Sequence, residues 1–256
     1  MGALVIHEIV RDQGEEELDR SLAGLAWSGI AAGLSIVFSA LVQATLQARL
    51  PDTEWRPLVA GFGYATGFLI VILGRQQLFT ETTLTAVIPA LTRRDAQTVL
   101  RALRVWVIVL TANILATWAF GGILSLPDGF SPQVKEAVIE LSAHTTDAPF
   151  WHTVMTGGCA GWLIGLMVWL LPAARSSQPL VIILLTYIIA IGQFPHIIAG
   201  SVEAAFSVLQ GKASFGTYLM HFLVPTFIGN AVGGTFLAAL LNHAPLREVL
   251  REGDAD

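Results

Sequence analysis

Two short polar stretches in an otherwise apolar chain carry the side chains that could do chemistry. The first is GRQQLFTETT, residues 74–83, and the second is GQFPH, residues 192–196. Both lie inside apolar runs, at the depth of a bilayer core, where irregular backbone is tolerated only if it is buried in protein or lines a water-filled cavity. The hydroxyl of Thr80 and the imidazole of His196 are the groups suited to hydrogen bonding and proton transfer to a small solute.

The composition indicates a membrane protein with several spans. Hydrophobic residues make up 54% of the 256 residues and charged residues 13%, whereas soluble domains carry about a quarter charged residues. The net charge of −5 gives no reason to expect a nucleic acid partner. The single cysteine, Cys159, leaves no disulfide framework or CxxC metal site. Because no HExxH pattern, paired carboxylates or Ser/His dyad stands out, we expect neither an enzyme nor a cofactor.

Six apolar windows predict six transmembrane helices. A helix needs about twenty apolar residues to cross the hydrocarbon, and the charge-free windows are residues 21–48, 57–74, 105–127, 153–174, 176–202 and 213–246. The second span is counted as one crossing in two pieces, because this count places nine arginines on the side of the N-terminus and four basic residues on the other. The positive-inside rule then puts both termini in the cytoplasm, with the chain in a cell membrane, expected to be a bacterial inner membrane.

The span count divides the chain into three parts. Residues 1–20 are expected to form an amphipathic cytoplasmic segment, residues 21–246 the transmembrane domain, and residues 247–256 a cytoplasmic tail. The transmembrane domain divides into two repeats of three spans, about 21–125 and 150–246. Three is an odd number, so the second repeat is inverted relative to the first.

Matching features in the two halves support the repeat. The second and fifth spans are both interrupted, and the third and sixth spans carry Asn113 and Asn230 between small residues. Asn113 follows Thr80 by 33 residues, and Asn230 follows His196 by 34. Both asparagines are expected to bridge neighbouring helices, and GxxxG patterns in the first and fourth spans predict close helix packing. Inverted repeats place the working site near the midplane, where the broken helices meet.

Three motifs in order resemble those of the formate–nitrite transporter family. They are LFT at 78–80, FPH at 194–196 and GNAVGG at 229–234, and the resemblance covers roughly residues 20–245. Some positions depart from the family pattern: Glu81 follows LFT where Ser or Gly is common, and Pro195 stands where an acid often precedes the histidine. These departures resemble a divergent, YfdC-like branch of the family.

The resemblance implies a fold and a site. The fold would be aquaporin-like and all-α, with one pore in each protomer of a homopentamer in the lipid bilayer. Thr80 would face His196 between two apolar constrictions. Leu78 and Phe79 would contribute to one constriction and Phe194 would line the other.

The chemistry of such a pore favours a neutral permeant. A charge at the bilayer centre costs about 2.5–3.5 kcal/mol, and protonation of formate or nitrite removes most of that cost. His196 could attract the anion as imidazolium, pass a proton through Thr80, or serve only helix packing. The leading interpretation is a channel or proton-coupled transporter for small monovalent anions or their neutral acids. The alternatives are a neutral small-solute pore and a non-conducting membrane scaffold whose pore is plugged by Arg75.

Three charged residues inside the broken spans are expected to form an intramembrane charge network. Breaking a buried ion pair by removing one partner typically costs about 3–5 kcal/mol, so Arg75 should have an acidic partner. Glu81 and Glu203 are the acids inside the broken spans. As a structural clasp, the pair would hold the loop; as an anion attractor, Arg75 would draw anions toward Thr80.

Overall fold

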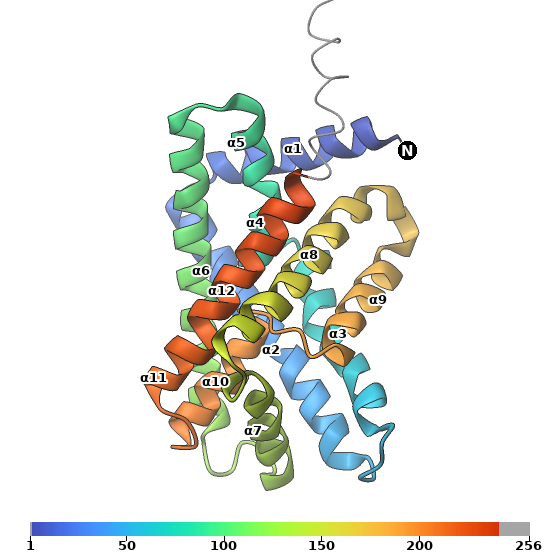
Figure 1. The fold of residues 1–256 in the computed structure, drawn as a ribbon, viewed down its shortest axis with the longest axis vertical. Coiled ribbons are helices and arrows are strands. Elements are labelled where there is room, and N and C mark those ends of the chain that lie inside the picture. Colours follow the sequence, from blue (N-terminus) through green and yellow to red (C-terminus); the bar gives the residue numbers. More distant parts are fainter. Residues whose placement is uncertain (1, 241–256) are drawn as a thin grey trace, which may run out of the picture.

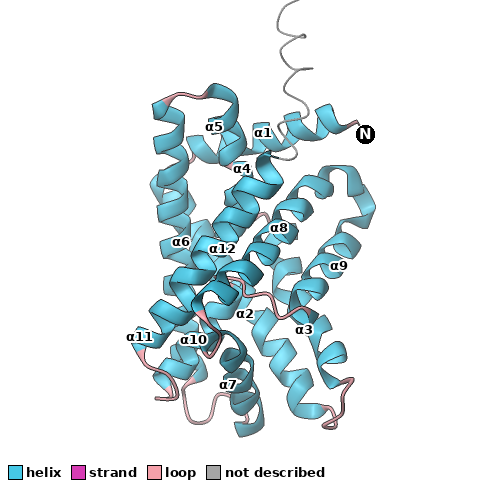
Figure 2. Cartoon of the chain, in the orientation of Figure 1, coloured by secondary structure: helices cyan, strands magenta, loops and turns pink. Residues whose placement is uncertain are grey.

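The structure is a computed structural model that describes residues 2–240, apart from the side chains of residues 144, 145 and 237–239. The regular secondary structure of this part of the chain is all helical, with loops between the helices and no strand (Figures 1 and 2). The tail expected over residues 247–256 lies outside the described residues. The prediction of an all-α chain is confirmed for the part that is described.

The helices are bounded as follows: α1 Ala3–Asp19, α2 Leu22–Arg49, α3 Arg56–Leu73, α4 Phe79–Thr85, α5 Val87–Arg93, α6 Ala96–Leu124, α7 Pro132–Thr146, α8 Phe150–Ala174, α9 Gln178–Ile191, α10 Ala199–Leu209, α11 Phe215–Thr217 and α12 Val224–Val232. A 3₁₀ turn at Arg175–Ser177 joins α8 to α9, and π-helical segments at Tyr218–Leu223 and Gly233–Leu240 flank α12. Five segments of the described chain are long and apolar enough to cross a membrane, namely α2, α3, α6, α8 with α9, and Phe215–Phe236.

The two interrupted spans end in the same kind of turn. The helix α3 stops at Gly74 and α4 begins five residues later, while α9 stops at Gly192 and α10 begins at Ala199. The residue after each glycine has a left-handed backbone, with φ of 49° at Arg75 and 51° at Gln193. Only glycine adopts this conformation without steric cost, so each break holds a locally strained residue.

Small residues let the long helices approach closely. A Cβ atom at Gly33 on α2 would lie 2.6 Å from the Cβ atom of Ala116 on α6. Such a distance is far inside van der Waals contact, so any side chain larger than hydrogen would push the two helices apart. The packing role predicted for the GxxxG pattern of the first span is therefore confirmed.

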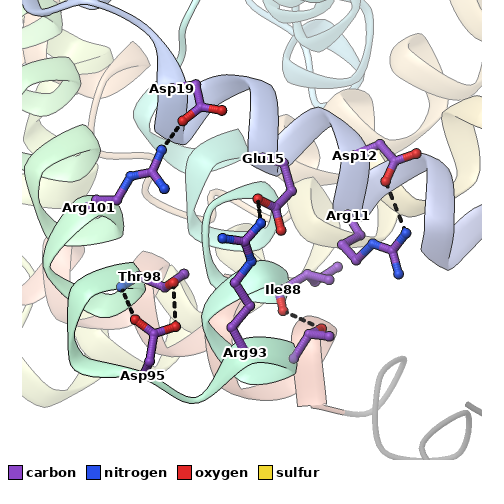
Figure 3. Close-up of polar contacts among 10 residues, drawn as sticks. Arg11, Asp12, Glu15, Asp19, Ile88, Arg93, Asp95, Thr98 and Arg101 are labelled. Atoms are coloured by element: carbon purple, nitrogen blue, oxygen red, sulfur yellow. Dashed lines mark hydrogen bonds and ion pairs between the residues drawn. The ribbon is translucent and has the colours of Figure 1, made fainter. Parts of the chain in front are cut away.

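The helix α1 lies across one end of the helical bundle, and α7 lies at the opposite end (Figure 1). Figure 3 shows the acids that α1 presents to the helices beside it: Glu15 pairs with Arg93 at 2.5 Å, and Asp19 pairs with Arg101. The apolar side of α1 packs on α4, α5 and α8 through a cluster of Ile6, Val10, Leu84, Ile88, Val168 and Trp169. Ion pairs and apolar burial together hold α1 against the bundle.

Candidate pore site

A buried hydrogen bond joins the two broken spans at the centre of the molecule. Thr80, at the start of α4, and His196, just before α10, lie 116 residues apart in the sequence. The Oγ1 atom of Thr80 lies 2.7 Å from Nε2 of His196. Both side chains are 1% exposed or less, so the structure brings together the two polar groups that the sequence singled out.

The other ring nitrogen of His196 identifies the tautomer. Its Nδ1 atom accepts from the backbone N–H groups of Ile198 at 3.3 Å and Ala199 at 3.1 Å. A nitrogen that accepts carries no proton, so the proton of the neutral ring is on Nε2 and is donated to Thr80. A second proton on Nδ1 would face two N–H donors, which disfavours imidazolium. The hydroxyl hydrogen of Thr80 is then left to donate to another group.

Asn113 on α6 fixes the first break. Its Oδ1 atom accepts from the backbone N–H of Phe79 at 2.9 Å. Its Nδ2 atom donates to the carbonyl of Gly29 on α2 at 2.7 Å and to that of Gln77 at 3.0 Å. One buried amide thus satisfies backbone groups that the interrupted helix leaves without partners.

Asn230 on α12 does the same at the second break. Its Oδ1 atom accepts from the backbone N–H of Ile197 at 2.8 Å. Its Nδ2 atom donates to the carbonyls of Gly157 on α8 and Pro195, both at 2.9 Å. Each asparagine therefore connects a break to a neighbouring long helix.

The matched hydrogen bonds define which residues correspond between the breaks. Phe79 corresponds to Ile197, because each donates its N–H to the bridging asparagine. By the same count Leu78 corresponds to His196, and Thr80 corresponds to Ile198, an apolar residue of the second break. The sequence comparison that set Thr80 against His196 was therefore two residues out of register. The polar pair is formed by positions that are not equivalent.

Apolar rings and side chains surround the polar pair. The ring of Phe68 on α3 stands edge-on to that of His196, with centroids 5.1 Å apart. Phe79 stacks on Phe227 with centroids 5.6 Å apart. Leu78 and Phe79 are fully buried in the main apolar core. A site enclosed in this way excludes water and strengthens the interactions of any polar group inside it.

Two pockets reach toward the polar pair from opposite ends of the molecule. The α7-side pocket, of about 600 Å³, is lined by residues that include Tyr64, Phe194, His196 and Glu203. The α1-side pocket, of about 450 Å³, is lined by fifteen residues, namely Ile9, Gln13, Glu16, Glu17, Arg20, Ile72, Arg75, Gln76, Gln77, Glu81, Thr85, Val168, Leu171, Pro172 and Gln178. Because His196 lines one pocket and the neighbours of Thr80 line the other, the Thr80–His196 hydrogen bond lies between them.

The charged residues of the broken spans do not form the expected pair. Among the described residues, no carboxylate lies within 4 Å of the Arg75 guanidinium. Arg75 is exposed and shares the α1-side pocket with Glu81, whereas Glu203 lines the α7-side pocket. An arginine open to a pocket can keep its hydration and needs no ion pair to offset burial. The prediction that Arg75 pairs with Glu81 or Glu203 is therefore wrong.

Other residues enter the site that the sequence gave no reason to choose. Glu17 reaches the α1-side pocket from α1, where its Oε2 atom accepts from the hydroxyl of Thr85 at 2.6 Å. Burial raises the pKa of the Glu17 carboxyl from 4.5 to about 7, although the hydrogen bond from Thr85 acts in the opposite direction. Phe68 and Tyr64 come from α3, the apolar piece before the first break, which carries no polar signal at these positions. The one sequence signal for Glu17 is the acidic run EEELD at residues 15–19, which fits equally well the polar side of an amphipathic helix.

The fold and this site define a class of protein. Apolar helices with two polar breaks that meet between two pockets are the architecture of a multi-pass membrane channel or transporter.

The chain belongs to the formate/nitrite transporter family, whose family model matches residues 4–244. It is 39% identical to the inner membrane protein YfdC of Escherichia coli (strain K12), over 96% of this chain and 79% of that protein. It is 23% identical to the formate channel BtFdhC of Bacillus thuringiensis, over 90% of this chain and 89% of that one.

Solved structures have the same fold. A pentameric formate channel with formate bound superposes with a TM-score of 0.69 at 19% identity, over 90% of this chain and 96% of that chain. An FNT family ion channel superposes with a TM-score of 0.70 at 21% identity, over 93% of this chain and 94% of that chain. Family membership, including the likeness to YfdC, confirms the resemblance drawn from the three motifs.

Proposed function

We propose that the chain forms a pore for small monovalent anions of the formate and nitrite kind, which cross its centre as neutral acids. The observation that carries this proposal is the enclosed Thr80–His196 hydrogen bond between two pockets. Because the ring is neutral and its proton is directed at Thr80, the site holds no full charge with which to trap an anion. The Thr80 hydroxyl is free to donate to the oxygen of a passing acid.

The permeant then meets two different environments. In a pocket it can remain an anion, because polar and charged side chains line both pockets. Between Leu78, Phe79 and Phe68 it meets an apolar passage, where an ion would cost about 2.5–3.5 kcal/mol even on the lower scales for the bilayer centre. A neutral acid avoids most of this cost. Thr80 and His196 supply the polar contacts at the narrow centre, with Phe194 at its α7-side mouth.

The topology belongs to the same proposal. We take the two-piece spans α3–α4 and α9–α10 as single crossings, which gives six crossings in two inverted repeats. The equivalent hydrogen bonds of Asn113 and Asn230 support this arrangement. The arginine distribution supports a cytoplasmic α1 side and a cytoplasmic C-terminus. Likeness to a pentameric formate channel supports a homopentamer with one pore in each protomer.

Arg75 has no ion pair with any described residue, which favours one of the two roles considered for it. An unpaired guanidinium at the rim of the α1-side pocket does not clasp the loop to Glu81. Its position suits attraction of an anion toward Thr80. It also lies outside the 2.7 Å contact between Thr80 and His196, which favours a conducting pore over a scaffold plugged by Arg75.

Flux into proteoliposomes tests the function. Labelled formate, nitrite, acetate and urea are compared at several external pH values, with empty liposomes as the control. We expect uptake of the acids to rise as the pH falls toward their pKa, and His196→Phe to lower this uptake at every pH, because the donor to Thr80 is lost. Uptake of urea at a rate equal to that of formate would favour the neutral-solute pore. The carboxyl group of Glu203 in the α7-side pocket is the observation that supports this alternative, because it gives an anion no attraction there. No uptake of any solute would contradict both.

A further inference from the structure

The α1-side pocket contains buried hydrogen-bond acceptors that have no donor. Gln77 is 7% exposed, and its Oε1 atom is buried without a partner among the described residues. The Oε1 atoms of Gln76 and Glu81 are also buried and unpartnered. All three residues line the same pocket. Because a buried acceptor without a donor costs free energy, such a set indicates a place for a ligand that brings its own hydrogen.

Gln77 is held in place through hydrogen bonds of both its backbone and its side chain. Its backbone N–H donates to Oγ of Ser28 at 3.1 Å, and its carbonyl accepts from Nδ2 of Asn113 at 3.0 Å. Its Nε2 atom lies 3.5 Å from Oε1 of Glu17 and donates toward it. The amide is therefore oriented by the carboxylate, which leaves Oε1 of Gln77 directed at the pocket.

Glu17 is fixed beside Gln77 by the close docking of α1. A Cβ atom at Gly14, one turn before Glu17, would lie 2.0 Å from the carbonyl oxygen of Thr85. The Thr85 hydroxyl donates to Glu17 at 2.6 Å. Two carboxyl groups from different helices, Glu17 on α1 and Glu81 on α4, thus line one pocket. Glu81 directly follows Thr80 in the sequence.

The charges around this pocket are of both signs. The titratable and charged groups that line it are Glu16, Glu17, Arg20, Arg75 and Glu81, and its lining residues from α8 and α9 are uncharged. Nearby charges on the packed helices are engaged elsewhere: Arg93 pairs with Glu15, Arg101 pairs with Asp19, Arg104 donates to the carbonyl of Arg20, Arg11 pairs with Asp12, and the ring of His7 packs edge-on to Trp169. The pocket therefore offers carboxyl groups and an unpaired guanidinium, that of Arg75, to the same ligand.

We propose that Glu17 and Glu81 form a proton-exchange site, at which one carboxylate takes the proton of the neutral acid that has passed Thr80, while Arg75 holds the anion left behind. The O–H bond of the acid breaks and a new O–H bond forms on the carboxylate. The electron pair stays on the acid oxygen, so one negative charge moves from the glutamate to the solute. The carboxyl group later loses its proton to water of the pocket. For a solute that enters from the α1 side, each step runs in reverse. This inference rests on the proposed function.

The raised pKa of Glu17 suits this role. A group that exchanges protons works best with a pKa near the working pH, and burial brings that of Glu17 to about 7. It is then protonated and deprotonated in comparable amounts near neutrality. The conjugate base is also stronger than the anion of an acid such as formic acid, so the transfer from solute to Glu17 is downhill.

Vesicles of opposite orientation test the site. In vesicles with the α1 side facing the bath, labelled formate enters as the anion through the proposed site. For the wild-type protein we expect uptake to change by no more than about twofold between pH 5.5 and 6.5 and to fall about tenfold per pH unit above 7, following the protonated carboxyl. For E17Q/E81Q we expect a fall of about tenfold per pH unit over the whole range, following free formic acid.

Matched variants and the opposite orientation supply the controls. E16Q removes a neighbouring exposed acid of the same pocket and should keep the wild-type profile. Uptake into vesicles with the α7 side facing the bath should have the same pH profile in E17Q/E81Q as in the wild type, which also shows that the variant is folded. If E17Q/E81Q does not assemble, E17Q alone should steepen the profile below pH 7.

The outcomes separate this inference from the function on which it rests. A wild-type profile in both E17Q/E81Q and E17Q with the α1 side facing the bath would overturn the proton-exchange site and leave the pore intact. Absence of formate uptake by the wild-type protein in both orientations would overturn the proposed function, and the exchange site with it.

Discussion

Removal of the Asn113 side chain tests how the first break is held. In Asn113→Ala three hydrogen bonds are lost, from Phe79 N–H and to the carbonyls of Gly29 and Gln77. At about 0.6 kcal/mol for an average hydrogen bond between membrane helices, the three together contribute roughly 2 kcal/mol. The N–H of Phe79 is also left buried without an acceptor, which adds about 1–3 kcal/mol. We therefore expect a loss of about 3–5 kcal/mol in the free energy of unfolding.

The assay is reversible unfolding of the purified protein in mixed micelles, together with size-exclusion chromatography of the assembled oligomer. Asn230→Ala removes three bonds of the same kind at the second break and should cost the same within about 1 kcal/mol. Thr186→Val is the matched control, because its buried hydroxyl bonds only to backbone carbonyls within α9. A loss below about 1 kcal/mol in Asn113→Ala would refute the reasoning that this amide secures the break.

Three further predictions follow from single contacts. The pKa of Glu17 is raised on folding, so the folded protein binds that proton more tightly. The contribution of Glu17 to stability should fall as the pH rises from about 4.5 to 7, by at most about 3 kcal/mol, and thermal melts of Glu17→Gln should show a correspondingly smaller dependence on pH over this range. Gly33→Ala should destabilise the protein by about 1–3 kcal/mol in the same melts, whereas Gly122→Ala, where a Cβ atom meets nothing within 4 Å, should not. Arg75→Ala should leave the melting temperature and urea flux unchanged and should lower formate flux severalfold; equal losses for both solutes would contradict an electrostatic role.

Much of the fold could be predicted because it follows from local chemistry. Runs of apolar residues dictate helices in a bilayer, and charged or glycine-containing interruptions within them dictate breaks. Thr80 and His196 stood out for this reason, since few polar groups occur at that depth. The structure places them in contact, as the order of the motifs led us to expect.

The details that could not be predicted depend on contacts between distant segments. Arg75 was expected to pair with an acid of the broken spans, because nothing in the sequence indicated that its left-handed turn exposes it to a pocket. Glu17 was overlooked because its role depends on docking of α1 onto Thr85, 68 residues away in the chain. The tautomer of His196 depends on two backbone N–H groups whose direction is fixed only once α10 is in place.

The hydroxyl of Thr80 is the group through which the central claim is tested most directly. The measurement is labelled formate flux into proteoliposomes for wild type, Thr80→Val, Thr80→Ser and the control Thr186→Val. Valine keeps the shape of threonine and removes the hydroxyl, while serine restores it. We expect flux to fall by at least about tenfold in Thr80→Val, corresponding to about 1.4 kcal/mol, and to stay within about threefold of wild type in Thr80→Ser and Thr186→Val. Wild-type flux in an assembled Thr80→Val protein would contradict the claim that the Thr80–His196 pair serves the permeant.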